Sequence, residues 1–138
     1  MQSSRPLVAV VDDEESVRCA LARLLRASGF DAECFASGEA FLGSLAGRRP
    51  DCVVLDLQMG GMSGRDVQRQ LIGLPTSVPL IIITAHDEPR IREQSLADGA
   101  AAYLRKPLRG EALVRSVHQA IGGAGARYDQ GPMRAPGQ

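Results

Sequence analysis

Short apolar runs alternate along this chain with segments in which apolar residues recur every three or four positions. Four of the five runs are almost wholly apolar, which is typical of strands buried on both faces of a parallel sheet. The run at 31–35 alternates polar and apolar residues, so it predicts a less buried strand. The predicted strands cover residues 7–11, 31–35, 52–55, 80–83 and 100–104.

The segments between these strands have the period of amphipathic helices. In the first of them Val17, Leu21 and Leu24 share one face, and Gly29 follows as a helix stop. The second is short, and Ser37 is its predicted N-cap. The predicted helices are 16–28, a short one that ends near 47, about 65–72, one that follows Pro89, and about 109–121.

Two stretches depart from this regular pattern. The helix after Pro89 is poorly amphipathic, because Ile91 and Leu96 are its only large apolar residues. Residues 122–138 are rich in Gly, Ala and Pro and have no periodicity, which predicts a flexible tail or linker. Residues 1–121 are therefore predicted to form the one folded domain.

The order of the elements predicts an α/β fold. Strands that alternate with helices form a parallel sheet, and right-handed crossovers place helices on both faces, which gives a doubly wound sandwich. Such folds bind ligands outside the carboxyl ends of their strands. Functional residues are therefore expected directly after the predicted strands.

Composition narrows the class of protein. Lys plus Arg and Asp plus Glu number 16 each, so the net charge is zero, which argues against a chain that coats nucleic acid or an anionic membrane. The chain holds no apolar run long enough to span a bilayer and no signal-like start, so a cytoplasmic location is predicted. The three cysteines, Cys19, Cys34 and Cys52, lack metal-binding spacing and are expected to be small buried residues in a reducing compartment.

Polar residues stand at four of the strand ends. Asp12 and Asp13 follow the first strand, Asp56 the third, Thr84 the fourth and Lys106 the fifth. Carboxylates held close together repel unless a cation lies between them, and oxygen ligands suit Mg²⁺ or Mn²⁺. A carboxylate can also attack phosphorus and form an aspartyl phosphate. Singly, these residues could be helix caps, turn residues or a solvated charge; together they predict a site for phosphoryl transfer.

With these strand-end residues, the chain resembles the receiver domains of response regulators in bacterial two-component signalling. The resemblance covers about residues 7–121 and adds a flavodoxin-like (βα)5 three-layer sandwich with strand order 2-1-3-4-5. It rests on Val10–Glu14, Leu55–Leu57, Met62–Gly64, Ile83–Ala85, Asp98–Ala100 and Lys106–Pro107. Residues in the first helix and at 35–38 also resemble the branch that joins a receiver to a C-terminal helix-turn-helix domain.

The resemblance implies a role for each site residue. Asp56 would accept a phosphoryl group from a histidine of a sensor kinase. Asp12, Asp13, Asp56 and the backbone carbonyl of Gln58 would hold Mg²⁺, for which Mn²⁺ can substitute, with Asp13 the more direct ligand of the acid pair. Lys106 would pair with the phosphoryl group. Thr84 and Tyr103 would act as the conformational switch that responds to the phosphoryl group. Gln58 and His86 would tune the lifetime of that group.

One position departs from the family pattern. The family usually has Pro four residues after the acceptor, where this chain has Gly60, followed by Gly61. Glycine adds backbone freedom, so we expect a more mobile loop and a less firm placement of the metal by Gln58.

The leading hypothesis is a phosphorylation-activated switch that modifies only itself and is not an enzyme for an external substrate. On phosphorylation it would control transcription through a downstream domain or partner, or dimerise through the helix after Pro89, the fifth strand and the last helix. Residues 122–138 are too few for a helix-turn-helix unit, so direct nucleic-acid binding by this chain is not expected. The chain is expected either to stop in a linker or to act alone through contacts.

Two other classes remain as alternatives. A phosphohydrolase that forms an aspartyl phosphate commonly has a second Asp two residues after the first, where this chain has Gln58. A module that binds partners without phosphorylation would not need all of Asp12, Asp56 and Lys106.

Overall fold

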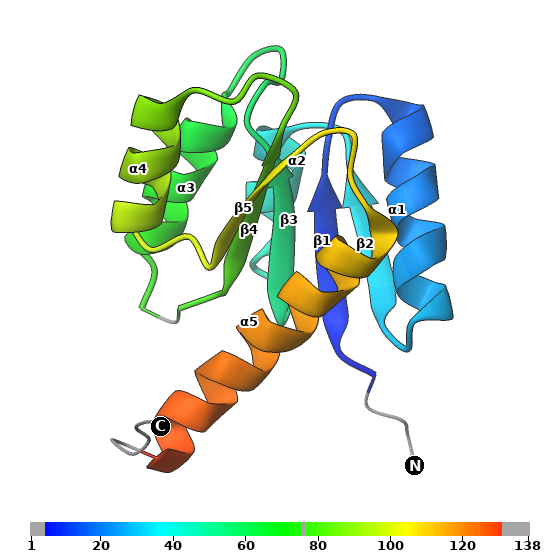
Figure 1. Ribbon diagram of the computed structural model, residues 1–138, viewed down its shortest axis with the longest axis vertical. Helices are drawn as coiled ribbons and strands as arrows, with labels where there is room; N and C mark the ends of the chain where they lie inside the picture. The colour runs from blue at the N-terminus through cyan, green and yellow to red at the C-terminus, as the bar shows by residue number, and fades with distance from the viewer. Residues whose placement is uncertain (1–4, 76, 131–138) are drawn as a thin grey trace.

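The computed structural model describes residues 5–75 and 77–130, in which five strands alternate with five helices (Figure 1). Each strand is four or five residues long, and each is followed by one helix. The elements are β1 (Leu7–Val11), α1 (Glu15–Ala27), β2 (Asp31–Phe35), α2 (Gly38–Ser44), β3 (Cys52–Asp56), α3 (Gly64–Ile72), β4 (Leu80–Thr84), α4 (Pro89–Ala97), β5 (Ala102–Arg105) and α5 (Gly110–Gln130).

The strands form one parallel sheet in the order β2-β1-β3-β4-β5, as predicted. Every residue of β1, β3 and β4 is buried, whereas the two edge strands β2 and β5 are partly exposed. The register places Val10 between Cys34 and Val54. All five arrows therefore point to one end of the sheet, and the loops that carry the polar strand-end residues meet there (Figure 1).

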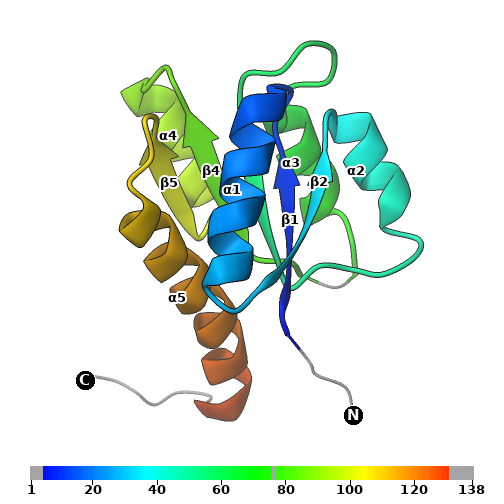
Figure 2. The same cartoon turned by 90° about the vertical axis from the view of Figure 1, so that its right-hand side faces the viewer.

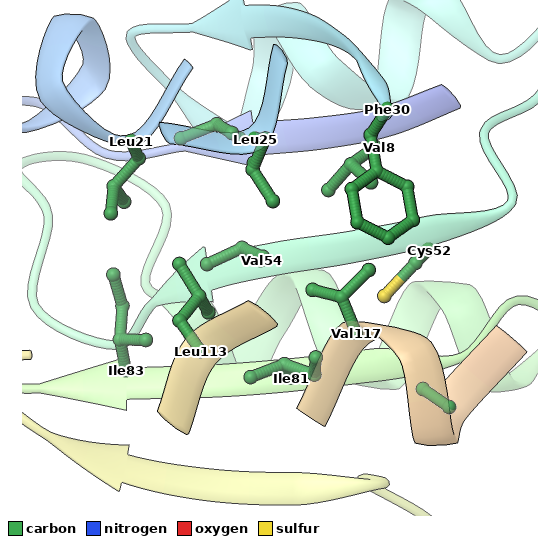
Figure 3. Close-up of a cluster of buried hydrophobic side chains, with 12 residues drawn as sticks. Val8, Leu21, Leu25, Phe30, Cys52, Val54, Ile81, Ile83, Leu113 and Val117 are labelled. Atoms are coloured by element: carbon green, nitrogen blue, oxygen red, sulfur yellow. The ribbon is translucent and has the colours of Figure 1, made fainter. Parts of the chain in front are cut away.

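Helices cover both faces of the sheet. Helices α1 and α5 lie on one face, and α2, α3 and α4 lie on the other (Figures 1 and 2). Side chains alternate between faces along a strand, so Val8 and Val10 point toward α1 and α5, while Ala9 and Val11 point to the opposite layer. Figure 3 shows the first cluster, in which Leu25 of α1 and Leu113 of α5 close over the sheet.

Local sequence signals set the helix ends that border the site. The Ser37 side chain accepts a hydrogen bond from the Ala40 N–H at 3.0 Å, which confirms it as the N-cap of α2. Ser63 and Asp66 form a reciprocal capping box at the start of α3. These caps satisfy free N–H groups, so α2 and α3 begin at defined residues beside the strand ends.

The predicted end of the last helix near Ile121 is wrong, because α5 continues to Gln130. No proline interrupts the chain between Gly122 and Gln130, and each added residue extends an existing helix by one backbone hydrogen bond. Glycine costs a helix only about 1 kcal/mol relative to alanine, so the glycines lower helix propensity without ending the helix. The rest of the predicted tail, residues 131–138, lies outside the described residues. The last turns of α5 project beyond the sheet (Figures 1 and 2).

Helix α4 is held in place mainly by polar contacts. Ser95 is its only fully buried residue, and Leu96 is 43% exposed, in agreement with the weak amphipathic pattern. From α3, the buried Gln68 side chain donates to the Ser95 carbonyl at 3.0 Å, and Arg65 binds the Asp98 carboxylate at 2.9 Å. We call these contacts the α3–α4 latch. Helices with little apolar burial are easily displaced, so α4 depends on this latch.

Replacing Gln68 with alanine is predicted to loosen α4. The change removes a buried hydrogen bond and leaves a small void, which together cost about 2 kcal/mol of the free energy of unfolding. Amide hydrogen exchange in α4 should become faster than in α1, as mass spectrometry of peptides would show. Gln70→Ala, at an exposed position of the same helix, is the control. Equal exchange in the two variants would show that the latch does not hold α4.

Candidate functional site

The structure brings the five polar strand-end residues to one end of the sheet. Asp12 and Asp13 follow β1 directly, Asp56 and Thr84 are the last residues of β3 and β4, and Lys106 follows β5. Asp12, Asp56 and Thr84 are at most 3% exposed, and the Lys106 side chain is 17% exposed. The sheet register accounts for this convergence, since Asp56 lies beside Ile83 and Thr84 beside Arg105.

Three carboxylates form a cluster at the centre of the site. Asp12, Asp13 and Asp56 each place an oxygen within 4.8 Å of the other two. Each also accepts a backbone N–H: Asp12 from Glu14 at 3.0 Å, Asp56 from Gln58 at 3.2 Å, and Asp13 from Gly60 at 3.3 Å. These bonds fix one oxygen of each carboxylate. The cluster fits a hard divalent cation, because such ions prefer carboxylate and carbonyl oxygens.

Lys106 is the ammonium that faces this cluster. Its Nζ lies 3.0 Å from Asp12 Oδ2 and 3.5 Å from Asp56 Oδ2. Glu14 stands further out, with Oε1 3.9 Å from the same Nζ. Burial alone would lower the pKa of Lys106, but the hydrogen bond and charge of Asp12 and the charge of Asp56 outweigh it and raise the pKa. The lysine therefore stays charged at neutral pH.

Asp56 is the member of the cluster whose charged form is disfavoured by its surroundings. Burial raises the pKa of its carboxyl from 3.8 to about 6, and the charge of Asp12 adds to the shift. The Gln58 N–H and Lys106 lower the pKa but do not cancel these effects. One lysine is therefore too little positive charge for two buried carboxylates, and a further cation or a change of charge on Asp56 would relieve the repulsion.

A second group of polar side chains covers Thr84. The Thr84 hydroxyl donates to Gln58 Oε1 or to the His86 carbonyl, each at 3.2 Å, and accepts from the His86 N–H at 3.1 Å. His86 Nδ1 also lies 2.9 Å from Gln58 Oε1. Amide oxygens only accept, so this ring nitrogen carries the proton in that contact. Gln58 and His86 thus join the ends of β3 and β4 at the rim of the site.

Tyr103 lies apart from these contacts. It is partly exposed on β5 and paired with Ile82, and both its side chain and Ile91 of α4 pack against the core cluster that holds Ile82. Burial raises the pKa of its hydroxyl. Tyr103 and the weakly held helix α4 therefore border the same core cluster.

Two features of the site were not predicted from the sequence. Gly64 opens α3 so close to β3 that a Cβ there would lie 2.5 Å from the Asp56 carbonyl oxygen, so only glycine allows this approach. Its place beside Ser63 in a family motif was the available signal. The Gly60 N–H that binds Asp13 leaves no signal in the sequence, because every residue except proline carries that group.

No helix in residues 5–75 and 77–130 is long and apolar enough to cross a bilayer. A family model described as the response regulator receiver domain matches residues 8–118. Among curated relatives, the response regulator protein TmoT of Ectopseudomonas mendocina is 33% identical over 133 residues, which cover 96% of this chain and 60% of TmoT. The transcriptional regulatory protein FixJ of Rhizobium meliloti is 34% identical over 82% of this chain and 55% of its own length.

Comparison with solved structures indicates the same family. The crystal structure of a response regulator receiver protein from Burkholderia phymatum is 49% identical, with a TM-score of 0.77 over 86% of this chain and 96% of that one. The chain spans only about three fifths of the length of TmoT and just over half of that of FixJ. The family model covers residues 8–118, which hold nearly all of the sheet and all of the polar strand-end residues. This chain therefore belongs to the response regulator receiver domains of two-component signalling systems.

Proposed function

We propose that this chain is a Mg²⁺-dependent switch that accepts a phosphoryl group on Asp56 from a histidine of a sensor kinase. The observation that carries the proposal is the position of Asp56, buried between Asp12 and the Lys106 ammonium at 3.5 Å. The family accounts for the kinase partner, since receiver domains act with sensor kinases. In the transfer, an Asp56 oxygen bonds to phosphorus as the phosphorus–nitrogen bond to the donor imidazole breaks.

The residues at the acid cluster are suited to this transfer. Asp12, Asp13, Asp56 and the Gln58 backbone carbonyl would hold Mg²⁺ or Mn²⁺, with Asp13 the more direct ligand because Asp12 is buried and already bonded to Lys106. The ion, when bound, supplies positive charge that neutralises the carboxylates and the phosphoryl oxygens. Lys106 provides the second positive charge and can move from Asp12 to a phosphoryl oxygen without leaving the cluster.

Thr84 would be the switch that reports the phosphoryl group. Its hydroxyl is held by Gln58 and His86, so a phosphoryl oxygen must compete for this donor. Once Thr84 turns toward Asp56, Tyr103 would turn inward and change its contact with α4. Because α4 lies beside β5 and has only one buried residue, we propose that this change alters the face formed by α4, β5 and α5 and favours a homodimer.

The output is proposed to be control of transcription through a downstream domain or partner. Support comes from the relatives, since FixJ is named a transcriptional regulatory protein and this chain covers only 55% of its length. The chain itself is proposed to turn over no external substrate and to catalyse only its own phosphorylation and dephosphorylation. A phosphohydrolase is disfavoured by the site, where an amide, Gln58, points to Thr84 in place of a second acid.

Phosphorylation is predicted to require both Asp56 and a divalent cation. Incubation with a small acyl phosphate and Mg²⁺ should add the mass of one phosphoryl group to the wild type but none to Asp56→Asn. Glu111→Gln, an exposed change on α5, is the control and should behave as the wild type. Excess chelator should prevent the reaction. Modification of Asp56→Asn, or full modification in chelator, would refute the assignment, and light scattering on the same samples tests dimer formation.

Stability of the metal-free protein is predicted to fall as pH rises through the titration of Asp56. The folded carboxyl has a pKa of about 6 against 3.8 when unfolded, so between about pH 4 and 6 the folded state binds more protons than the unfolded state. The free energy of unfolding therefore falls as pH rises through this range. The total decrease from this group is about 3 kcal/mol, at 1.36 kcal/mol per pKa unit.

Urea unfolding in chelator between pH 4 and 7 measures this effect. Asp56→Asn should become more stable than the wild type as the pH rises, with the difference complete above pH 6, whereas Glu111→Gln should track the wild type. Parallel pH profiles for Asp56→Asn and the wild type would show that the Asp56 carboxylate is not under repulsion.

The lifetime of the phosphoryl group is predicted to shorten in His86→Ala. The imidazole and Gln58 Oε1 form a 2.9 Å contact at the rim, and a paired ring restricts the path of water to phosphorus. The decay of the phosphorylated species at pH values on both sides of the usual histidine pKa of about 6.5 measures this. His118→Ala, a histidine that stacks on Phe30 away from the site, is the control. A longer lifetime in His86→Ala would mean that the histidine orients the water instead.

A further inference from the structure

Gly60 contacts the acid cluster through its backbone. Its N–H donates to Asp13 Oδ2 at 3.3 Å and so joins the loop after β3 to the loop after β1. Among the described residues, this is the only hydrogen bond of the Asp13 carboxylate, and no lysine or arginine there pairs with it. Asp13 is also the only exposed member of the cluster. Within the described part of the chain, the Gly60 N–H is thus the one hydrogen-bond donor that holds this carboxylate.

Steric reasons do not explain glycine at this position. Gly60 is not among the glycines with positive φ, and a Cβ built on it meets nothing within 4 Å. An alanine would therefore fit without strain. The feature that separates Gly60 from the proline usual in this family is the N–H itself, because proline has no backbone donor.

The hydrogen bond leaves Asp13 ready to bind a cation. Oδ2 accepts the Gly60 N–H, and one oxygen of this carboxylate lies within 4.8 Å of an oxygen of Asp12 and of Asp56. Donors in the outer shell of a metal site orient the ligating carboxylate and reduce the rotational freedom lost on binding. The bond is exposed and long, so its competition for the carboxylate charge is weak, and orientation is its main effect.

The same bond acts on a second ligand of the site. Gln58, whose backbone carbonyl is the proposed protein ligand from this loop, lies two residues before Gly60. Its N–H is bonded to Asp56 Oδ1 at 3.2 Å. The loop segment 58–60 is therefore tied to the cluster at both ends. This arrangement opposes the looser loop that two adjacent glycines predict.

We propose that Gly60 is a positioning residue for Mg²⁺, whose backbone N–H orients Asp13 and holds the 58–60 segment over the acid cluster. The inference rests on the proposed metal site and adds a group that the usual proline cannot supply. Loss of the donor is expected to weaken Mg²⁺ binding about three- to tenfold, which is the size of effect of one typical hydrogen bond, because this bond is long and exposed.

The matched pair Gly60→Pro and Gly60→Ala tests this inference, since only the first removes the donor. Titration of the metal-free proteins with MgCl₂, followed by calorimetry or NMR without a phosphodonor, should give Gly60→Pro a Kd about three- to tenfold above the wild type. Gly60→Ala should match the wild type. Thermal unfolding in chelator checks that both variants fold. Equal Kd values for the proline and alanine variants, or tighter binding by the proline variant, would overturn the proposal.

A second measurement reads the hydrogen bond directly. The Gly60 amide proton in the NMR spectrum of the metal-free protein should shift upfield in Asp13→Ala and remain in place in Glu111→Gln. An unchanged shift in Asp13→Ala would also overturn the proposal. If the wild type fails to bind Mg²⁺ at all, the metal-dependent function fails together with this inference. Normal wild-type binding with no effect of Gly60→Pro refutes the role of Gly60 alone.

Discussion

Repulsion between buried carboxylates is the constraint on which the rest of this site depends. Asp12 and Asp56 are almost fully excluded from water, yet a single ammonium, Lys106, lies between them. Burial and the charge of Asp12 raise the pKa of Asp56, so the carboxylate form of the proposed acceptor is disfavoured in the folded chain. A bound cation would lower the energy of this arrangement, and a phosphoryl group on Asp56 would change the balance of charge. The site is therefore suited to respond to either ligand under the proposed function.

The parallel sheet explains how so much charge is held in one place. The central strands β1, β3 and β4 are anchored by apolar layers on both faces, and their last residues cannot withdraw into solvent without disrupting the core. Gly64 tightens this further, because α3 packs directly on the backbone of Asp56 and Leu57. By contrast, α4 has little apolar burial and relies on Gln68 and Arg65. The molecule combines a rigid site with one easily shifted helix.

Sequence patterns predicted the strands and the residues at their ends, because apolar runs and strand-end polar residues follow directly from burial on both faces of a sheet. The order of the strands was implied by the family resemblance and is confirmed. They failed where the determining groups are backbone atoms or rotamers. The end of α5 was missed because glycine weakens a helix without terminating it. The contacts of Gly60 with Asp13, and of Gln58 with His86 across the rim, depend on loop conformation, which residue types alone do not specify.

Two competing sets of partners for Thr84 would provide the physical basis of the proposed switch. In this structure the hydroxyl is held by Gln58 Oε1 and the His86 carbonyl, away from the acids. A phosphoryl group on Asp56 would offer charged oxygens, and a hydrogen bond to a charged acceptor is about twice as strong as one to an amide. Movement of Thr84 also frees Gln58 and His86 to pair more closely at the rim. Under the proposed function, the residues that release Thr84 would therefore be the same ones that shield the phosphoryl group from water, which would couple the strength of the signal to its duration.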